Sequence, residues 1–499
     1  MRTANRHRYD FFPYVGAAVP AAHIGRLESV ASLFGMTPAA PAAARILELG
    51  CGTGANLLPL ALDNPQATIV GCDLACTAIA SAREMANALG IANLELRHAD
   101  LADVDEGWGE FDYILCHDVF SWVAPEVRHK ILEIHARNLA PHGVGYISYD
   151  ALPGWRLHDV AREMMRYHTR HLDGSRETVE QARAMLAMAA EVQDQNPGTY
   201  ASLIRDEYCL LSAIPDDQLY HLVSEEHHQP FYFHEFLEIL QGATLQWLAN
   251  AGLESPWLSE VVPAFLQQAS LHEQQQYLDF FNNCTFRRAL VCRGDAQLCR
   301  HPEEHVLRRL WIGLTSAATV EPAFASGEMR LRADGREVRT SDPTTSEALR
   351  HLDEMRPELV PCSQLFGSRG ALPVDFLMNA MGSGAIDGVL TPFHLTNQIG
   401  EFPTTSPLVR LQARQGGLVT NQKSEPVRLS GLMRYVAQRL DGEHDRSALT
   451  EDIARQLHSN AVKMDREIVL LDTAANPSDL TDACLRYFRD NALLISDIA

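Results

Sequence analysis

An acid followed by three alternating glycines, the motif Glu-x-Gly-x-Gly-x-Gly at residues 48–54, is the stretch of this chain best suited to chemistry. Glycine is needed where the backbone takes a positive φ or where a ligand approaches it closely. The continuous apolar run 46–49 predicts a buried parallel strand, and a helix is expected to begin near Ala55. The free N–H groups of a helix start favour electronegative atoms. Together these features predict a cradle for a nucleotide-type cofactor.

Polar residues close the strands expected next along the chain. Asp73 ends the second apolar run, Asp100 follows the third, and His117 and Asp118 follow the fourth. An acid after the second strand is placed to bind a ribose diol, and ligands of open α/β sheets lie beyond the carboxyl ends of the strands. The glycines also satisfy the degenerate dinucleotide pattern G-x-G-x-x-A, which is a weak signal alone.

Alternating strands and helices are expected to position these residues. Residues 77–89 and 125–139 have helical apolar spacing, and 144–149 predicts a fifth strand. This β-α repeat favours a parallel sheet with right-handed crossovers. Residues 156–280 are then nearly all helical in pattern, and 285–292 is the next convincing strand.

The motif at residues 48–54, with acids after the second and third strands, resembles the class I S-adenosylmethionine-dependent methyltransferases over about the first 150 residues. A sheet of that class continues beyond its fifth strand. We therefore expect the helical block to be an insertion and the strand at 285–292 to return to the sheet.

A narrower resemblance extends over the whole chain. The phrases Ser-Tyr-Asp-Ala-Leu-Pro-Gly-Trp at 148–155 and His-Asp-Val-Phe-Ser-Trp-Val at 117–123, with the segment 230–236, are similar to bacterial methyltransferases that carry a methyltransferase regulatory domain. Their best-known members are the rickettsial-type outer-membrane-protein lysine methyltransferases. This resemblance implies an α/β fold: a Rossmann-like class I methyltransferase sheet with a large helical insertion and C-terminal α+β winged-helix-like modules. It implies four parts: a cofactor-binding core at 1–160 with a returning strand near 284–295, a helical regulatory or dimerisation block at 161–283, a winged-helix-like middle module at 296–395, and a second such module at 396–499.

The resemblance also implies two sets of site residues. S-adenosyl-L-methionine is the expected cofactor, bound by Glu48, Gly50, Cys51, Gly52, Gly54, Asp73, Leu74, Asp100, Leu101 and His117. The acceptor is expected in an aromatic-lined slot with Tyr14, Phe120 and Trp122. The catalytic candidates are His117 or Asp118, which could accept the departing proton, and Tyr149 in the lining. A lysine acceptor must be neutral, and burial lowers the pKa of an amine.

Three functions remain open at this point. The first is transfer of methyl groups to lysine side chains of a protein, with the helical block and the C-terminal modules selecting that protein. The second is methylation of a small molecule on nitrogen or oxygen, with the helical block as a lid. The third is a non-catalytic binding or regulatory module, which is hard to reconcile with an intact glycine motif and both acids. We favour the first because so much of the chain lies outside the catalytic sheet.

Composition limits the partners. The formal net charge is −22, from 64 acids against 42 bases in 499 residues, which disfavours nucleic acid. No apolar stretch is long enough for a membrane span, and residues 1–8 are basic without the apolar region of a signal peptide. Ten scattered cysteines without a CxxC pair favour the cytoplasm. We expect no metal, because the adjacent histidines at 227 and 228 suit a solvated loop better. The helical block is a candidate homodimer surface.

Overall fold

The computed structural model describes residues 9–10, 12–253, 264–322, 328–368, 370–458 and 476–495. The basic stretch 1–8, and residues 254–263 of the expected helical block, lie outside the described residues. Among the residues described, no helix is long and apolar enough to cross a membrane.

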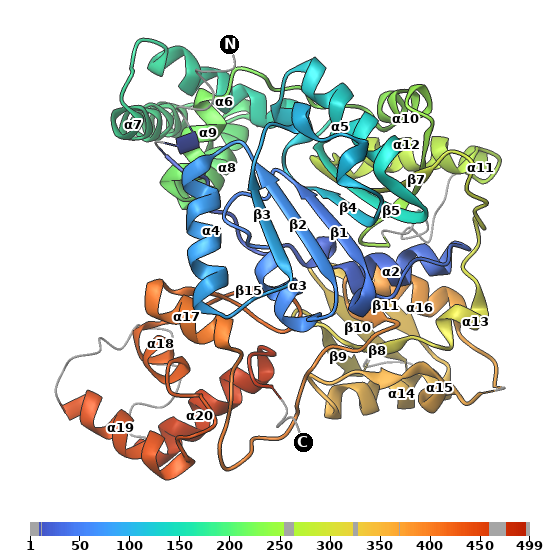
Figure 1. The fold of residues 1–499 in the computed structure, drawn as a ribbon, viewed down its shortest axis with the longest axis vertical. Helices are drawn as coiled ribbons and strands as arrows, with labels where there is room; N and C mark the ends of the chain where they lie inside the picture. Colours follow the sequence, from blue (N-terminus) through green and yellow to red (C-terminus); the bar gives the residue numbers. More distant parts are fainter. Residues whose placement is uncertain are drawn as a thin grey trace.

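A seven-stranded sheet of order β3-β2-β1-β4-β5-β7-β6 forms the centre of the molecule (Figure 1). Strands β1 to β5 are parallel, while β7 is antiparallel to both β5 and β6. Their cores are buried on both faces, which explains the continuous apolar runs of β1, β2 and β4. The strands are β1 (Arg45–Leu49), β2 (Thr68–Asp73), β3 (Leu94–His98), β4 (Phe111–Cys116), β5 (Leu139–Asp150), β6 (Leu245–Asn250) and β7 (Phe286–Arg293).

Helices cover both faces of this sheet, as the β-α repeat predicts. One hydrophobic cluster joins Leu27, Ile46 and Tyr113, and another joins Leu47, Ile114 and Phe236. The helical elements of this part are η1 (Pro20–Ala22), α2 (Ile24–Leu33), η2 (Pro41–Ala43), α3 (Leu57–Asp63), α4 (Cys76–Ala88), η3 (Leu101–Asp103), η4 (Glu106–Trp108), η5 (Phe120–Trp122) and α5 (Pro125–Asn138).

A long insertion separates β5 from β7, which confirms the expected helical insertion and the return of the chain to the sheet. Its two ends lie side by side, because the Gly154 amide donates to the carbonyl of Cys284 at 3.0 Å. The inserted helices are α6 (Trp155–Thr169), α7 (Ser175–Asp194), α8 (Thr199–Ala213), α9 (Asp216–Ser224), α10 (Phe233–Gly242), α11 (Ala264–Gln267) and α12 (Leu271–Asn282).

Strand β6 is an element that the helical pattern of residues 156–280 did not reveal. It pairs with β7 at the edge of the sheet, with Trp247 opposite Val291. A short apolar run such as 245–250 is compatible with either a strand or a buried helix, so its pairing decides its structure.

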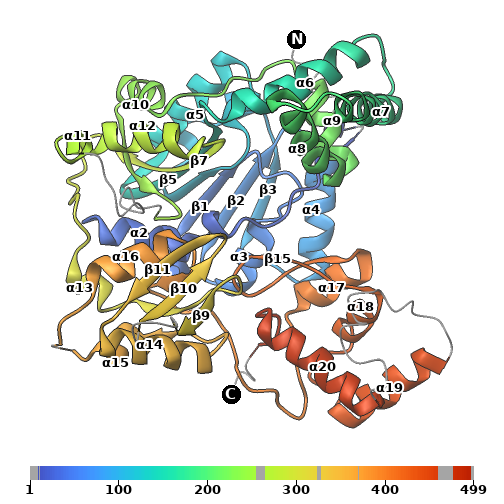
Figure 2. The same ribbon diagram turned by 180° about the vertical axis from the view of Figure 1, so that it is seen from behind.

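The last 200 residues form two groups below the sheet in the view of Figure 2, each built around a hydrophobic cluster, and a smaller cluster joins Val389 to Ala492. The first group comprises α13 (Glu304–Leu307), β8 (Trp311–Leu314), β9 (Thr319–Pro322), β10 (Met329–Ala333), β11 (Arg336–Thr340), α14 (Pro343–Glu354), β12 (Val360–Pro361), α15 (Cys362–Phe366), α16 (Val374–Gly382) and β13 (Ile386–Val389). The second comprises α17 (Pro407–Gln415), β14 (Leu418–Thr420), β15 (Pro426–Arg428), α18 (Gly431–Ala437), α19 (Arg446–His458) and α20 (Pro477–Asp490).

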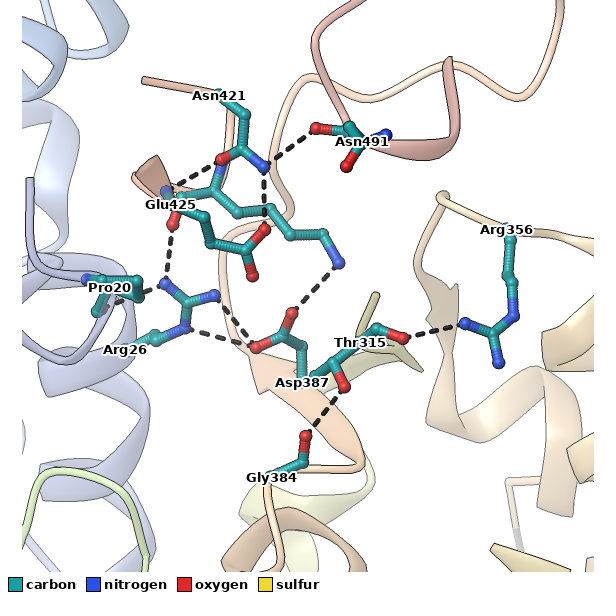
Figure 3. A network of polar contacts seen from close by, with 10 residues as sticks. Pro20, Arg26, Thr315, Arg356, Gly384, Asp387, Asn421, Glu425 and Asn491 are labelled. Atoms are coloured by element: carbon teal, nitrogen blue, oxygen red, sulfur yellow. Dashed lines mark hydrogen bonds and ion pairs between the residues drawn. The ribbon is translucent and has the colours of Figure 1, made fainter. Parts of the chain in front are cut away.

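A buried ion network joins both groups to the N-terminal part of the chain (Figure 3). Asp387 on β13 pairs with Arg26 of α2 at 3.0 Å and with Lys423, between β14 and β15, at 3.1 Å. Arg26 also donates to the carbonyl oxygens of Pro20 and Lys423. Burial opposes the charge of Asp387, but Arg26 and Lys423 prevail and hold its pKa well below the ordinary value.

Candidate active site

A cavity of about 1500 Å³ opens at the carboxyl ends of the parallel strands. Glu48 from β1, Asp73 from β2 and Asp150 from β5 contribute to its wall. Side chains from the loops after β3 and β4, including Asp100 and His117, complete this edge. The cavity is therefore at the place where open α/β sheets bind ligands.

The three glycines of the turn after β1 differ in what surrounds them. All three have positive φ, at 74° for Gly50, 51° for Gly52 and 77° for Gly54. A Cβ at Gly52 would enter open space, since its nearest neighbour is a carbonyl oxygen 4.0 Å away. Gly54 instead packs against Leu58 and Ala82 and does not line the cavity. Gly50, Cys51 and Gly52 thus form the ligand-facing part of the turn.

Asp73 is held as an acceptor beside this turn. Its Oδ2 atom accepts the Gly52 amide at 2.8 Å, and its Oδ1 atom accepts the Ala75 amide at 2.8 Å. Burial raises its pKa, and these amide bonds limit the effect. Each oxygen keeps a further lone pair, so the carboxylate can also accept two hydroxyl groups.

The loops after β2 and β3 supply apolar side chains and an acid to the cavity wall. Asp100 caps η3 by accepting the Ala102 amide at 3.0 Å, and Leu74 and Leu101 line the cavity beside it. A flat aromatic ring system is the kind of group that such a wall accommodates.

Glu48 has one carboxylate oxygen without a partner. Its Oε1 atom accepts the side-chain amide of Asn56 at 2.7 Å, while no described residue bonds its buried Oε2 atom. Burial raises the pKa of this carboxyl to about 8. Asn56 also accepts the backbone amide of Val19 at 2.8 Å. Asn56 was not among the predicted site residues, although a polar residue in a helix start after a glycine turn was a usable signal.

His117 and Asp118 are both in the wall, in different roles. The Nδ1 atom of His117 lies 3.0 Å from the Tyr146 hydroxyl and 3.2 Å from Ser148 Oγ, and burial lowers the pKa of the imidazole. Asp118 has a φ of 55°, which is uncommon outside glycine but tolerated by aspartate. Its Oδ2 atom accepts the Tyr14 hydroxyl at 3.2 Å. Burial, followed by the Asp118 charge, raises the pKa of Tyr14.

Besides Gly54, which was predicted to bind the cofactor but does not line the cavity, the structure corrects two predicted positions, Phe120 and Tyr149. Both side chains are fully buried in the cluster around Phe236, with the Tyr149 ring centroid 4.3 Å from that of Phe236. Side chains alternate along a strand, so Ser148 and Asp150 face the cavity side of β5 while Tyr149 points to the opposite face. The prediction that Tyr149 and Phe120 line the acceptor slot is therefore wrong.

Aromatic rings and carboxyl groups gather at the end of the cavity beyond Asp118. Tyr9, Tyr14, Trp122 and Trp155 line it, as do Asp118, Asp150 and Glu225. The rings of Trp122 and Trp155 meet edge to face, with centroids 5.8 Å apart. The Tyr9 hydroxyl donates to Glu225 at 3.3 Å. This end combines π surfaces with negative charge.

Asp150 and His228 were missed as site residues. Asp150 ends the fifth strand, so the reasoning that selected Asp73 and Asp100 would have found it. His228 was expected in a solvated loop, but its side chain is 3% exposed and lies 3.0 Å from Asp150. Only the folded insertion brings these two residues together. Within the described residues, no group of three or more His, Cys, Asp or Glu side chains is arranged to hold a metal ion.

Three family models match separate parts of the chain. A methyltransferase domain matches residues 46–143, a predicted methyltransferase regulatory domain matches 215–293, and the C-terminal winged helix domain of PKMT matches 401–493.

Relatives and solved structures agree with these matches. An uncharacterized protein of Rickettsia prowazekii (strain Madrid E) is 29% identical over 489 residues, covering 93% of this chain and 88% of its own length. A second uncharacterized protein of that organism is 34% identical over 241 residues, covering 48% of this chain and 96% of the relative. PKMT2 from Rickettsia typhi, solved in complex with AdoHcy, superposes with a TM-score of 0.82 at 25% identity, covering 97% of this chain and all of that one. The chain belongs to the rickettsial-type class I S-adenosylmethionine-dependent methyltransferases that carry a regulatory domain.

The residues of the cavity fit S-adenosylmethionine, the cofactor of this family. The buried, unpartnered Oε2 atom of Glu48 suits a cationic amino group, since a buried polar atom without a partner is costly. The open space in front of Gly52 admits a ligand against the backbone. When bound, the cofactor supplies an electrophilic methyl group on a sulfonium.

Proposed function

We propose that this methyltransferase modifies lysine side chains of a protein. The observation that carries the proposal is the acceptor end of the cavity, defined here as Tyr9, Tyr14, Trp122, Trp155, Asp118, Asp150 and Glu225. Aromatic faces and carboxylates attract an ammonium group, and apolar ring surfaces accommodate an aliphatic stem. The name PKMT (protein lysine methyltransferase) of the matching winged-helix model and of the Rickettsia typhi protein supports the same acceptor.

We assign the cofactor contacts as follows. Glu48 pairs with the amino group, and the backbone of Gly50, Cys51 and Gly52 lies along the methionine and ribose. Asp73 accepts the ribose hydroxyls, for which it keeps lone pairs. The adenine lies against Leu74 and Leu101 near Asp100. His117 and Asp118 shape the boundary between cofactor and acceptor, with Asp118 held by Tyr14.

Because methyl transfer is an in-line displacement, the main task of these side chains is positioning. The aromatic rings exclude water from the acceptor end, and a desolvated amine loses its proton more readily than one in water.

The decisive experiment incubates the enzyme with tritium-labelled S-adenosylmethionine and a lysate of the expression host. We expect label in methyl-lysine after acid hydrolysis of the protein fraction, and mass spectrometry then identifies the modified proteins. Label confined to the small-molecule fraction would favour a small-molecule acceptor, with the inserted helices acting as a lid.

Two further features are part of the proposal. We infer a division at 1–160 with 284–295, 161–283, 296–395 and 396–499, supported by the hydrophobic cluster centred on each of the last two parts. We also infer a cytoplasmic homodimer formed through the inserted helices. Exposed apolar side chains on α6 to α8 support it, among them Tyr167, Met188 and Val192. All ten cysteines are free, as expected in the cytoplasm. Light scattering on the purified protein tests the dimer.

A further inference from the structure

Asp150 is a buried carboxyl group held rigidly at the acceptor end of the cavity. It is 2% exposed and lines the cavity at the end of β5. Its backbone amide donates to Ser121 Oγ at 2.9 Å, and its carbonyl accepts the Phe231 amide at 2.9 Å. The carboxyl group is therefore fixed by its own backbone against both η5 and the insertion.

The inserted block supplies the partner of this carboxyl group. The Nε2 atom of His228 lies 3.0 Å from Asp150 Oδ2. The imidazole ring packs against Trp122 and Trp155, with centroid distances of 4.3 and 5.0 Å. The neighbouring Gln229 amide donates to the Ser121 carbonyl at 2.9 Å, which fixes the loop that carries the histidine.

Burial and the surrounding charges shift the pKa values of the two groups. Burial, then Asp118 and Asp159, raises the pKa of Asp150 well above its ordinary value. Burial, then Arg162, Arg166 and Arg128, lowers the pKa of His228 to about 3. The lowered pKa favours the neutral imidazole, whose Nε2–H can donate to Oδ2 when Asp150 is ionised. The titratable or charged side chains facing this pair are Asp118 after β4, Arg128 on α5, and Asp159, Arg162 and Arg166 on α6.

We propose that Asp150 accepts the proton that the acceptor amine must lose, and that His228 is the positioning residue that holds its carboxylate. This inference rests on the proposed amine acceptor. No side chain of the described residues donates to Oδ1 of Asp150, which leaves that oxygen for the ammonium group. An N–H bond of the ammonium breaks, its electron pair stays on nitrogen, and the proton forms an O–H bond with Oδ1. His228 keeps donating to Oδ2 throughout, and no co-reactant is needed.

Burial raises the pKa of Asp150, which makes its carboxylate a stronger proton acceptor than that of an exposed aspartate. The Nδ1 atom of His117 is already within hydrogen-bond distance of two hydroxyl groups, so this nitrogen is not available to take the proton.

The test measures initial rates of methyl-lysine formation from pH 6 to 10, with tritium-labelled S-adenosylmethionine and total lysate protein as acceptor. Asp150→Asn should lower the rate at neutral pH by about 100-fold. Its residual rate should climb with pH as the acceptor amine loses its proton in water. His228→Leu should move the acid limb of the profile to higher pH, because the carboxylate loses a donor. His228→Gln should restore the profile, since its amide still donates. His168→Gln, on the exposed end of α6, is the control.

Calorimetric titration with AdoHcy separates proton transfer from a merely structural role. We expect unchanged affinity in all of these variants. A wild-type rate in Asp150→Asn, an unmoved profile in His228→Leu, or an affinity loss as large as the rate loss would overturn the inference. If His228→Leu fails to fold, the profile of Asp150→Asn decides alone. If the wild-type enzyme labels no lysine at all, the proposed function fails instead, and this inference fails with it.

Discussion

The acids of the cavity differ in which of their oxygen atoms are already engaged. Asp73 accepts two backbone amides and Asp100 accepts one, so the main chain holds both in place. Glu48 is held by a side chain, Asn56, and keeps a buried oxygen free of any partner among the described residues. A ligand that places a positive charge beside Glu48 therefore gains more binding free energy than a ligand that only fills the cavity.

Gly52→Asp should abolish cofactor binding without unfolding the C-terminal modules. The new side chain would enter the cavity from a backbone with a φ of 51° and set a second negative charge beside Asp73. We expect the affinity for AdoHcy, measured by calorimetry, to fall at least about 100-fold, which is about 2.7 kcal/mol.

Gly90→Asp is the matched control. Gly90 also has a positive φ, and a Cβ there would meet nothing within 4 Å, yet this glycine lies in a turn away from the cavity. Equal loss of affinity in both variants, or undiminished binding in Gly52→Asp, would refute the assignment of the turn to the cofactor.

Binding of S-adenosylmethionine at pH 7 should release close to one proton. Without ligand, burial holds the Glu48 pKa at about 8, so the carboxyl group is mostly protonated. A cationic amino group beside Oε2 favours the carboxylate and expels that proton. Calorimetry in buffers of different ionisation enthalpy counts it. In Glu48→Gln the release should vanish and the affinity should fall about 10- to 100-fold, the value of a charged hydrogen bond. Unchanged proton release would place the titrating group elsewhere.

A site residue can be predicted when its role follows from its neighbours in the sequence, and cannot when its role depends on a residue far along the chain. Asp73 and Asp100 follow from strand ends visible in the sequence. Tyr149 was misplaced because neighbouring residues on a strand face opposite sides, and an error of one position reverses the face. His228 had no local signal, since its partner lies 78 residues away.

At the scale of elements, the insertion begins and ends at one point of the core. The Gly154 amide bonds the Cys284 carbonyl, and Ala151 bonds Thr285 in the same way at 2.9 Å. The segment 148–155 therefore contains the end of β5 and also holds the two ends of the insertion together.

Gly154→Ala should destabilise this junction. A Cβ there would lie 2.3 Å from the Asn283 carbonyl oxygen and 2.5 Å from that of Cys284, both of which are backbone atoms. We expect a loss of about 1–3 kcal/mol in unfolding free energy, as for other overpacked sites, detected as a lower thermal midpoint. Gly242→Ala near the end of α10 meets nothing within 4 Å and should leave the midpoint unchanged or raise it slightly. An unchanged thermal midpoint in Gly154→Ala would mean that the two ends of the insertion can move apart without a loss of unfolding free energy.

Helices with a regular spacing of apolar residues were predictable from the sequence. A strand that only its pairing with a neighbouring strand distinguishes from a helix was not. The expected helices at 77–89 and 125–139 correspond to α4 and α5 within one residue at each end. Strand β6 escaped because only its pairing with β7 distinguishes it from a helix. The return of β7 was predictable from the resemblance, because a sheet of this class continues beyond its fifth strand.

At the scale of the whole molecule, Asp387 joins three parts of the chain that are distant in sequence. Its two cationic partners come from α2 and from the turn between β14 and β15. Lys423 is 3% exposed, so its charge is compensated by Asp387 rather than by water. No sequence pattern announces such a contact, because each residue alone is an ordinary charged side chain.

Asp387→Asn should lower the unfolding free energy by about 3–5 kcal/mol at pH 7, since it leaves the buried Lys423 and the partly buried Arg26 without their carboxylate. The folded pKa of Asp387 lies below the unfolded value of about 3.9, so its contribution is present above that pH and is lost as the pH falls through the folded pKa. The difference in midpoint between wild type and variant should therefore narrow below about pH 4. Asp353→Asn removes a surface pair with Arg356 and should cost less than about 1 kcal/mol. A difference that stays constant with pH would contradict this account.

The three-way contact at Asp387 also has an evolutionary consequence. A buried carboxylate and a buried ammonium on different elements cannot be replaced one at a time without passing through an unpaired charge. Lineages of this family should therefore exchange positions 387 and 423 together, and a winged-helix module transplanted from a distant relative should be accepted only when it brings the matching charge at 423.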